Sequence, residues 1–222
     1  MTQPDSDSDS AYAYVHGFGS SSLSRKGGML RERFAALGQT LYLPDLNVPS
    51  FEQLTYTGAL SALSALDERE GGNKQWRLIG SSMGSYISAR WAELNPDRVD
   101  RLVLLCPAFD LMTRWPQMMG EVAFGLWQRK GAFFFAGPDG EPAPLHWGFV
   151  EDARLHPPYA EVPCATHIIH GLQDEIVPIE SSRNYAAERF DIDLTEVDDG
   201  HDLAASHDVI FEVARAHFGI SA

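Results

Sequence analysis

The sequence predicts an α/β fold of three layers: a mostly parallel sheet of about six strands, helices on both faces, and a small helical cap inserted after the fourth strand. Short apolar runs of strand type alternate along the chain with runs of helical type, which is the pattern of parallel sheets. The third strand ends in the turn Gly80-Ser81-Ser82-Met83-Gly84, directly before a helix. Residues 110–160 interrupt the alternation and predict the cap.

Each expected strand is a short apolar run, and each expected helix has apolar residues at helical spacing. The strands cover residues 11–15, 40–43, 75–79, 101–106, 165–170 and 192–197. The helices cover residues 25–37, 51–69, 83–94, 181–190 and 204–218. Catalytic groups of such sheets gather at the carboxyl ends of the strands, so candidate site residues are sought there.

The composition predicts one domain and no nucleic-acid partner. A chain of 222 residues with 44% hydrophobic residues can bury one core, and we assign residues 11–222 to a single domain. The formal charge of −14 repels phosphate backbones, and the 17 Lys and Arg residues are scattered. Residues 1–10 are acidic and serine-rich, which predicts a disordered tail.

The chain also lacks any apolar run long enough to span a membrane and any pattern of a secretory signal, so we expect a cytoplasmic protein. Two cysteines, Cys106 and Cys164, are too few for a disulfide framework and each adjoins an expected buried strand. Both are therefore expected to be reduced structural thiols. The sequence sets no oligomeric state.

The turn at residues 80–84 has the pattern of a nucleophile elbow, G-x-S-x-G. A serine on such a sharp strand-to-helix turn presents its hydroxyl outward, and the crowded backbone leaves no room for side chains at Gly80 and Gly84. Ser82 lies between the two glycines and is therefore the candidate nucleophile, in preference to Ser81. The alternative is an ordinary strand-to-helix turn.

A serine hydroxyl becomes nucleophilic when a histidine takes its proton and a carboxylate orients that histidine. Asp174 lies in the loop after the strand at 165–170 and is the candidate acid. A capping role within the loop is the structural alternative for Asp174. The other candidate acids are Glu175, Asp198 and Asp199.

His201 is the candidate base, because it follows the strand at 192–197 in a glycine-bearing loop before the last helix. His207 and His217 lie in or near that helix and fit packed or surface roles better. His167 and His170 are three residues apart on one strand, so their side chains point to opposite faces and form no metal site unaided. We expect neither a metal nor a cofactor.

Two backbone N–H groups are expected to stabilise the oxyanion that forms in acyl transfer. One is that of Met83, the residue after the nucleophile. The other belongs to the loop His16-Gly17-Phe18-Gly19, where Phe18 is the first candidate and Gly19 the second. The glycine spacing of this loop fits neither a dinucleotide fingerprint nor a P-loop, which argues against a nucleotide site.

Residues 110–160 hold nine of the 24 Phe, Trp and Tyr residues of the chain. Because ligand pockets are mostly apolar, this cap is expected to line a substrate pocket over Ser82. The pocket candidates are Trp115, Trp127, Phe134 and Trp147. The alternative is that the aromatic side chains only attach the insertion to the sheet.

Together these motifs resemble the α/β-hydrolase superfamily over nearly the whole chain. The resemblance is carried by His16-Gly-Phe-Gly, the elbow, Gly171-x-x-Asp174-x-x-Val177-Pro178 and Gly200-His201. The stretch from Gly17 to Lys26, with the elbow, is similar to small YqiA-like bacterial esterases. The resemblance implies a triad of Ser82, Asp174 and His201 that hydrolyses esters or thioesters. Ser85, where a second glycine often stands, and the aromatic insertion depart from the family pattern.

The predicted function is hydrolysis of carboxylic esters of small or medium acyl chains through an acyl-enzyme. An acyl-CoA or acyl-carrier thioesterase is the first alternative, against which the net negative charge argues. A non-catalytic binding module is the second, because fold does not imply function. C–C bond hydrolases and cofactor-free perhydrolases share the triad. Since a histidine base must be neutral, activity is expected to decline below about pH 6.5, the reference value for imidazole.

Overall fold

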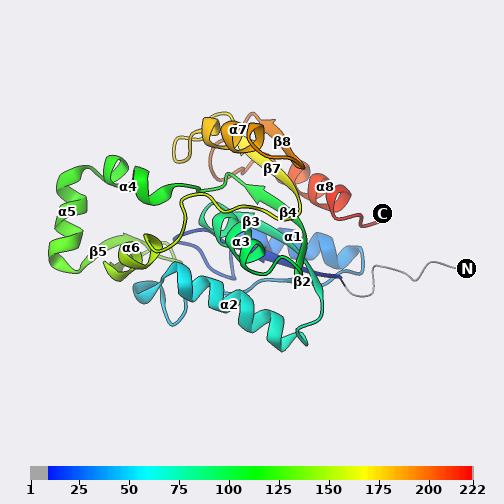
Figure 1. The fold of residues 1–222 in the computed structure, drawn as a ribbon, viewed down its shortest axis with the longest axis horizontal. Coiled ribbons are helices and arrows are strands. Elements are labelled where there is room, and N and C mark those ends of the chain that lie inside the picture. The colour runs from blue at the N-terminus through cyan, green and yellow to red at the C-terminus, as the bar shows by residue number, and fades with distance from the viewer. Residues whose placement is uncertain (1–9, 222) are drawn as a thin grey trace, which may run out of the picture.

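The computed structural model describes residues 10–221 and shows a six-stranded parallel sheet between two layers of helices (Figure 1). The order of the strands is β2-β1-β3-β4-β7-β8. They are β1 (Ser10–Val15), β2 (Leu41–Tyr42), β3 (Gln75–Ser81), β4 (Val99–Leu105), β7 (Ala165–Gly171) and β8 (Ile192–Val197). The predicted three-layer α/β fold is confirmed. The predicted tail at residues 1–10 lies outside the described residues except for Ser10, which begins β1.

Alternate residues of each central strand pack against opposite helical layers. In β1, Ala11, Ala13 and Val15 lie in one apolar cluster, whereas Tyr12 and Tyr14 lie in the other. The first cluster includes side chains of α2 (Tyr56–Arg69), α3 (Met83–Leu94) and α7 (Ile179–Ala187). The second includes side chains of α1 (Arg25–Ala36) and α8 (His207–His217).

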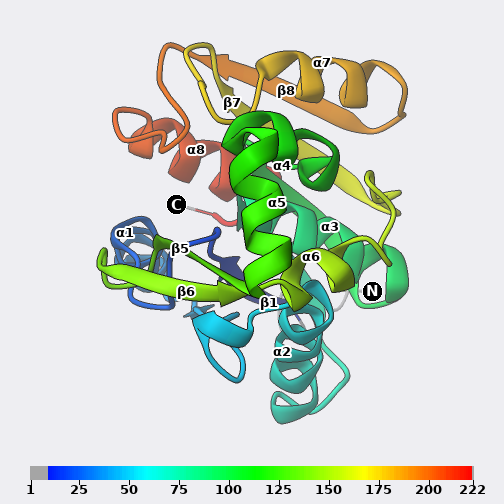
Figure 2. The same ribbon diagram turned by 90° about the vertical axis from the view of Figure 1, so that its left-hand side faces the viewer.

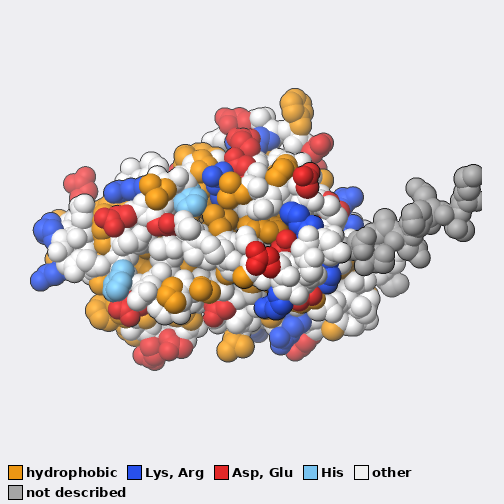
Figure 3. All heavy atoms as spheres, turned by 60° about the horizontal axis from the view of Figure 1, so that its bottom comes forward, with side chains coloured by type: hydrophobic (Ala, Val, Ile, Leu, Met, Phe, Trp, Pro, Cys, Tyr) orange, Lys and Arg blue, Asp and Glu red, His pale blue; other side chains and the backbone are white. Residues whose placement is uncertain are grey.

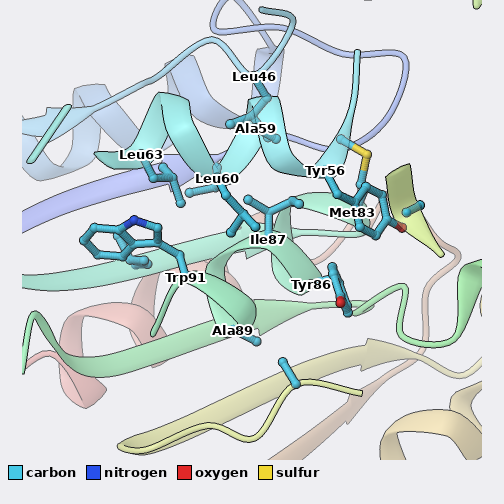
Figure 4. Packing of buried hydrophobic residues seen from close by; sticks show 14 of the residues in the cluster. Leu46, Tyr56, Ala59, Leu60, Leu63, Met83, Tyr86, Ile87, Ala89 and Trp91 are labelled. Carbon is cyan, nitrogen blue, oxygen red and sulfur yellow. The ribbon is translucent and has the colours of Figure 1, made fainter. Parts of the chain in front are cut away.

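Apolar side chains join α2 to α3 on the first face of the sheet. Figure 4 shows Leu60 and Leu63 of α2 opposite Ile87 and Trp91 of α3, all of them buried. The expected helix at 51–69 is divided into a short 3₁₀ turn, η1 (Phe51–Gln53), and α2. The division arises because the Thr55 hydroxyl caps the new helix by accepting a hydrogen bond from the Gly58 N–H at 2.9 Å.

The insertion between β4 and β7 lies at one end of the molecule, at the left of Figure 1, beside the carboxyl ends of the strands. It contains α4 (Leu111–Met119), α5 (Glu121–Lys130), β5 (Ala132–Ala136), β6 (Pro142–His146) and α6 (Gly148–Ala153). Figure 2 views this end, with α5 in front of the sheet and the two short strands beside it.

The expectation of a purely helical cap at residues 110–160 was wrong, because β5 and β6 form an antiparallel hairpin within it. Three consecutive phenylalanines favour an extended chain, and the Asp139-Gly140 turn reverses it, with Gly140 at φ 84°. The cap therefore combines helices with a hairpin.

The surface mixes side chains of different kinds. On the face shown in Figure 3, acidic and basic side chains are interspersed with apolar ones. Among residues 10–221, no helix combines the length and the apolar character that a membrane crossing requires.

The α2–α3 contact predicts a large stability effect at Ile87, which is fully buried. Ile87→Ala should lower the free energy of unfolding by about 2–5 kcal/mol, because the lost methyl groups leave a cavity that the helices close only in part. Urea unfolding measures the change. Leu155→Ala, at a side chain that is 80% exposed, is the control and should change stability by about 0.5 kcal/mol or less. Equal effects of the two substitutions would contradict this view of the contact.

Candidate active site

The backbone at Ser82 is strained, as the elbow pattern requires. Ser82 has φ 54° and ψ −116° at the junction of β3 and α3, a conformation that non-glycine residues adopt only under constraint. Its N–H donates a hydrogen bond to the Leu105 carbonyl at 2.8 Å, and its carbonyl accepts one from the Ala108 N–H at 3.2 Å. These bonds attach the turn to the end of β4 and its following loop.

Both elbow glycines are dictated by close backbone approaches. A Cβ on Gly84 would lie 2.2 Å from the Val15 carbonyl oxygen, and one on Gly80 would lie 2.5 Å from the Ser85 Cα. These obstacles are backbone atoms, so no side-chain rotation would relieve them. The first turn of α3 is thereby pressed against the end of β1.

The structure brings Ser82, His201 and Asp174 into one hydrogen-bonded chain. The Ser82 Oγ lies 2.9 Å from His201 Nε2, and His201 Nδ1 lies 2.7 Å from Asp174 Oδ2. The three residues follow β3, β8 and β7, whose carboxyl ends meet at one edge of the sheet. The loops after β7 and β8 approach so closely that a Cβ on Gly171 would lie 2.4 Å from the Asp199 carbonyl oxygen.

The alternative acids have other surroundings. Glu175 is exposed, and Asp198 accepts a hydrogen bond from Gln173 Nε2 at 2.6 Å. Asp199 caps its own loop by accepting bonds from the Gly200 N–H, the Ala205 N–H and the Ser206 hydroxyl. In the described residues, only Asp174 of these four carboxylates hydrogen-bonds to His201.

Asp174 is a fully buried carboxylate with four polar neighbours. Its Oδ1 accepts hydrogen bonds from the N–H groups of Ile176 at 2.9 Å and Val177 at 2.8 Å. Its Oδ2 faces His201 Nδ1 and also His170 Nε2, at 3.2 Å. Burial alone raises the pKa of Asp174, but the hydrogen bonds from His170, His201 and Val177 lower that pKa well below its usual range. The carboxylate is therefore ionised at neutral pH and holds His201 in the tautomer that keeps its Nε2 free for the serine proton.

His170 is a site residue whose role the sequence analysis missed. It is fully buried, with Nδ1 2.7 Å from the Ser182 hydroxyl and Nε2 2.9 Å from the Val177 carbonyl. His167 lies on the other face of β7, 2.8 Å from the Thr195 hydroxyl, as alternation along a strand requires. The position of His170 at the carboxyl end of β7 was the one sequence feature that could have indicated a role in the site. Its contact with Asp174 depends on the path of the loop after β7.

Cys106, His170 and Asp174 are the described residues grouped closely enough to hold a metal ion, with ligand atoms within 4.8 Å of one another. Their chemistry favours another explanation. Burial raises the pKa of the Cys106 thiol to about 12, so the thiolate that a metal needs is disfavoured. The polar atoms of Asp174 and His170 already have hydrogen-bond partners. The group is therefore a hydrogen-bonded acid beside a neutral thiol.

The two candidate oxyanion donors lie beside Ser82 and are unpartnered. Within residues 10–221, neither the Phe18 N–H nor the Met83 N–H donates a hydrogen bond. A Cβ on Gly17 would lie 3.3 Å from the Ser82 Cβ, so the loop after β1 passes directly over the serine. Both amides are available to a developing negative charge.

His16 anchors the loop after β1 through hydrogen bonds of its side chain. The side chain is buried, its Nδ1 donates to the Gly17 carbonyl at 2.9 Å, and its Nε2 accepts from the Leu46 N–H at 3.0 Å. Burial lowers the pKa of His16, which keeps the ring neutral and suits one donor and one acceptor nitrogen. The loop is thus tied to the segment after β2.

The aromatic insertion does not line the cavity at Ser82, contrary to the expected pocket. Trp115, Trp127 and Trp147 are buried against one another, whereas Phe134 is 64% exposed, because alternate residues of β5 face opposite sides. The cavity of about 350 Å³ that contains Ser82 is lined instead by the loop after β1, the start of α1, the end of β3 and the segment after β8.

The insertion contacts the loop after β1 through the Phe18 side chain. The Phe18 ring lies 5.4 Å from that of Trp115 and 5.5 Å from that of Phe135, both in edge-to-face geometry. A Cβ on Gly19 would lie 2.8 Å from the Ala136 carbonyl oxygen. The aromatic cluster therefore supports the loop that carries the Phe18 amide.

Comparison with known proteins places the chain in a family. The model of an uncharacterised protein family, UPF0227, matches residues 11–207. The chain belongs to this family. The resemblance to YqiA-like proteins of the α/β-hydrolase superfamily is thereby confirmed.

Two solved structures are similar over nearly the whole chain. A protein from Agrobacterium vitis S4 is 23% identical, with a TM-score of 0.81 over 99% of this chain and 91% of that one. Mouse alpha/beta hydrolase domain-containing protein 10 is 19% identical, with a TM-score of 0.75 over 95% of this chain and 90% of that one. Both show that the α/β-hydrolase fold is shared.

A curated relative is human mitochondrial palmitoyl-protein thioesterase ABHD10, which is 28% identical over 134 residues. The match covers 56% of this chain and 42% of the relative, so it spans less than half of that protein's length.

The depressed pKa of Asp174 predicts a pH-dependent contribution to stability. Because the folded-state pKa lies below the unfolded value of about 3.9, the ionised carboxylate contributes stability above about pH 4, and this is lost as the pH falls. Asp174→Asn cannot take up that proton, so its unfolding free energy should fall less than that of the wild type between pH 5 and pH 3. Urea unfolding at both pH values measures the slopes. The exposed Asp97→Asn is the control, and a wild-type slope in Asp174→Asn would contradict the assignment.

Proposed function

We propose that this protein is a serine hydrolase that cleaves carboxylic esters of small or medium acyl chains through an acyl-enzyme. The observation that carries the proposal is the continuous chain from Ser82 Oγ through His201 to Asp174, at 2.9 and 2.7 Å. It stands beside two unpartnered amides, in a chain of α/β-hydrolase fold. A nucleophile, a base, an orienting acid and oxyanion donors are the parts that acyl transfer needs.

In the first half-reaction, His201 Nε2 takes the Ser82 proton as the serine oxygen attacks the ester carbonyl. The N–H groups of Met83 and Phe18 stabilise the oxyanion that forms on the carbonyl oxygen. The protonated His201 then gives its proton to the leaving alcohol, while Asp174 stabilises the imidazolium by charge and hydrogen bond. The product of this step is an ester between the acyl group and Ser82.

In the second half-reaction, water takes the place of the alcohol. His201 removes a proton from the water, which attacks the acyl-enzyme, and the same two amides stabilise the second oxyanion. Collapse of this intermediate returns the proton to Ser82 and releases the acid. The proton transfers use Ser82, His201 and Asp174, whose side chains lie within hydrogen-bond distance of one another.

A small or medium acyl group is supported by the size of the cavity at Ser82, which is the space that the acyl group and the leaving group share. It has about 350 Å³, and most of its lining residues are polar, so it offers no long apolar channel. The insertion, which holds most of the nearby aromatic side chains, fills its own interior.

Thioester hydrolysis is the second candidate. The human relative that is 28% identical over 134 residues is named a palmitoyl-protein thioesterase. The same serine, histidine and acid would cleave a thioester by the same steps, with a thiol as the leaving group.

Ser82→Ala should lower turnover of p-nitrophenyl butyrate about 10,000-fold or more, because it removes the nucleophile. Covalent labelling by a fluorophosphonate probe should disappear as well. Circular dichroism and urea unfolding show whether the variant is folded. The control is Ser61→Ala, at an exposed serine on α2, which should keep both activity and labelling. Activity retained by Ser82→Ala would refute the assignment, and absence of labelling in the wild type would favour a binding module.

The choice between ester and thioester is tested with a matched pair of substrates. An ester and a thioester of the same acyl length, both with uncharged leaving groups, should differ, with the higher kcat/KM for the ester. A higher kcat/KM for the thioester would favour the second candidate. A series of p-nitrophenyl esters from acetate to palmitate should show its maximum at the short or medium chains.

A further inference from the structure

The cavity at Ser82 has a positively charged wall, although the chain as a whole carries a charge of −14. The cations of this wall are Arg25 and Lys26, at the start of α1, and the ring of His207, at the start of α8, lines the cavity beside them. Asp202 is the acidic residue of the lining, and its side chain is exposed. Local charge, rather than net charge, decides what such a cavity attracts.

Lys26 is the cation of this wall that lies deepest in the structure. Its ammonium group donates one long hydrogen bond, 3.4 Å, to the hydroxyl of Ser81, the neighbour of Ser82. Within residues 10–221, no ion pair joins Lys26 to a carboxylate within 4.0 Å, whereas Arg77 pairs with Asp100 and Arg98 pairs with Asp67. Burial lowers the pKa of Lys26, so its charge is incompletely compensated by the protein.

The acidic residues nearest to Lys26, Asp202 and Asp199, raise the pKa of Lys26 by their charges, but burial outweighs them. Asp199 is engaged in its own loop by the Ala205 N–H and the Ser206 hydroxyl. Burial, together with the charges of Lys26, Arg25 and Arg33, lowers the pKa of His207, which indicates a positive potential at this side of the cavity. A bound anion would supply the missing partner at Lys26.

The position of the cavity indicates which part of a substrate would meet Lys26. His201 delivers its proton to the leaving group, so the leaving group departs past His201 Nε2. The cavity is formed on that side, by His201 and the segment after it, together with the start of α1. We propose that Lys26 is a specificity-determining residue that binds a carboxylate or phosphate carried by the leaving group of the substrate. This proposal rests on the proposed hydrolase function.

The test compares leaving groups with and without an anion, on phenyl butyrate and 4-carboxyphenyl butyrate. Lys26→Gln should lower the ratio of kcat/KM for the anionic ester to that for the neutral ester by roughly 10- to 100-fold, the value of one hydrogen bond to a charged group. Lys26→Arg should restore most of the ratio. Lys130→Gln, which removes the same charge at an exposed site on α5, should leave the ratio unchanged.

The ratio separates recognition from a structural role. An equal loss on both esters, or no loss on either, would overturn the proposal, because a residue that only supports Ser81 would affect both substrates alike. A loss confined to monophenyl glutarate, which carries its anion on the acyl chain, would overturn the leaving-group assignment. If the wild type hydrolyses no ester and takes no fluorophosphonate label, the proposed function itself fails.

The chemistry of the anion is tested with two leaving-group mimics as competitive inhibitors of phenyl butyrate hydrolysis. 4-Hydroxybenzoate carries the carboxylate, and 4-hydroxyphenyl phosphate carries the phosphate. The mimic with the lower inhibition constant identifies the preferred group, and its inhibition constant should rise roughly 10-fold or more in Lys26→Gln and in high salt. Inhibition by neither mimic would count against the anion site.

Discussion

The contact between Gly84 and the end of β1 is the constraint on which the rest of the site depends. A Cβ at residue 84 would lie 2.2 Å from the Val15 carbonyl oxygen. Because Gly84 has no Cβ, α3 can begin directly against the end of β1, the strand that leads into the loop of Phe18. The same approach fixes Ser82 at φ 54° with its hydroxyl turned to His201. One backbone packing therefore sets the position of Ser82, the proposed nucleophile, and of the Phe18 and Met83 amides beside it.

The buried charge of Asp174 holds the His201 side of the site in place. Asp174 is removed from water at a cost in desolvation, and the hydrogen bonds from two N–H groups and two histidines offset that cost. The arrangement fixes His201 in one tautomer and one orientation. His170 also contacts the carboxylate, which gives a buried histidine on β7 a role although it does not line the cavity at Ser82.

The insertion supports the loop of Phe18 and does not line a pocket at Ser82. Its aromatic residues form an apolar core of their own, and Phe18 inserts its ring into that core. The loop that carries the Phe18 amide is thus held between His16 on one side and the insertion on the other. The cavity beside Ser82 is left mostly polar, with cations from α1 on its wall.

By itself the sequence determined the order of the six strands along the chain, the elbow and the loops that carry Asp174 and His201, because these depend on local periodicity and on turn residues close together in the chain. The tertiary structure alone decided which side chains share a cavity. Lys26 and His170 meet Ser81 and Asp174 through contacts across loops, and the side of β5 that Phe134 faces follows from hairpin pairing. The Lys26 contact depends on packing between distant segments, and the other two depend on how the loop after β7 and the hairpin pack on the sheet, which no local pattern encodes.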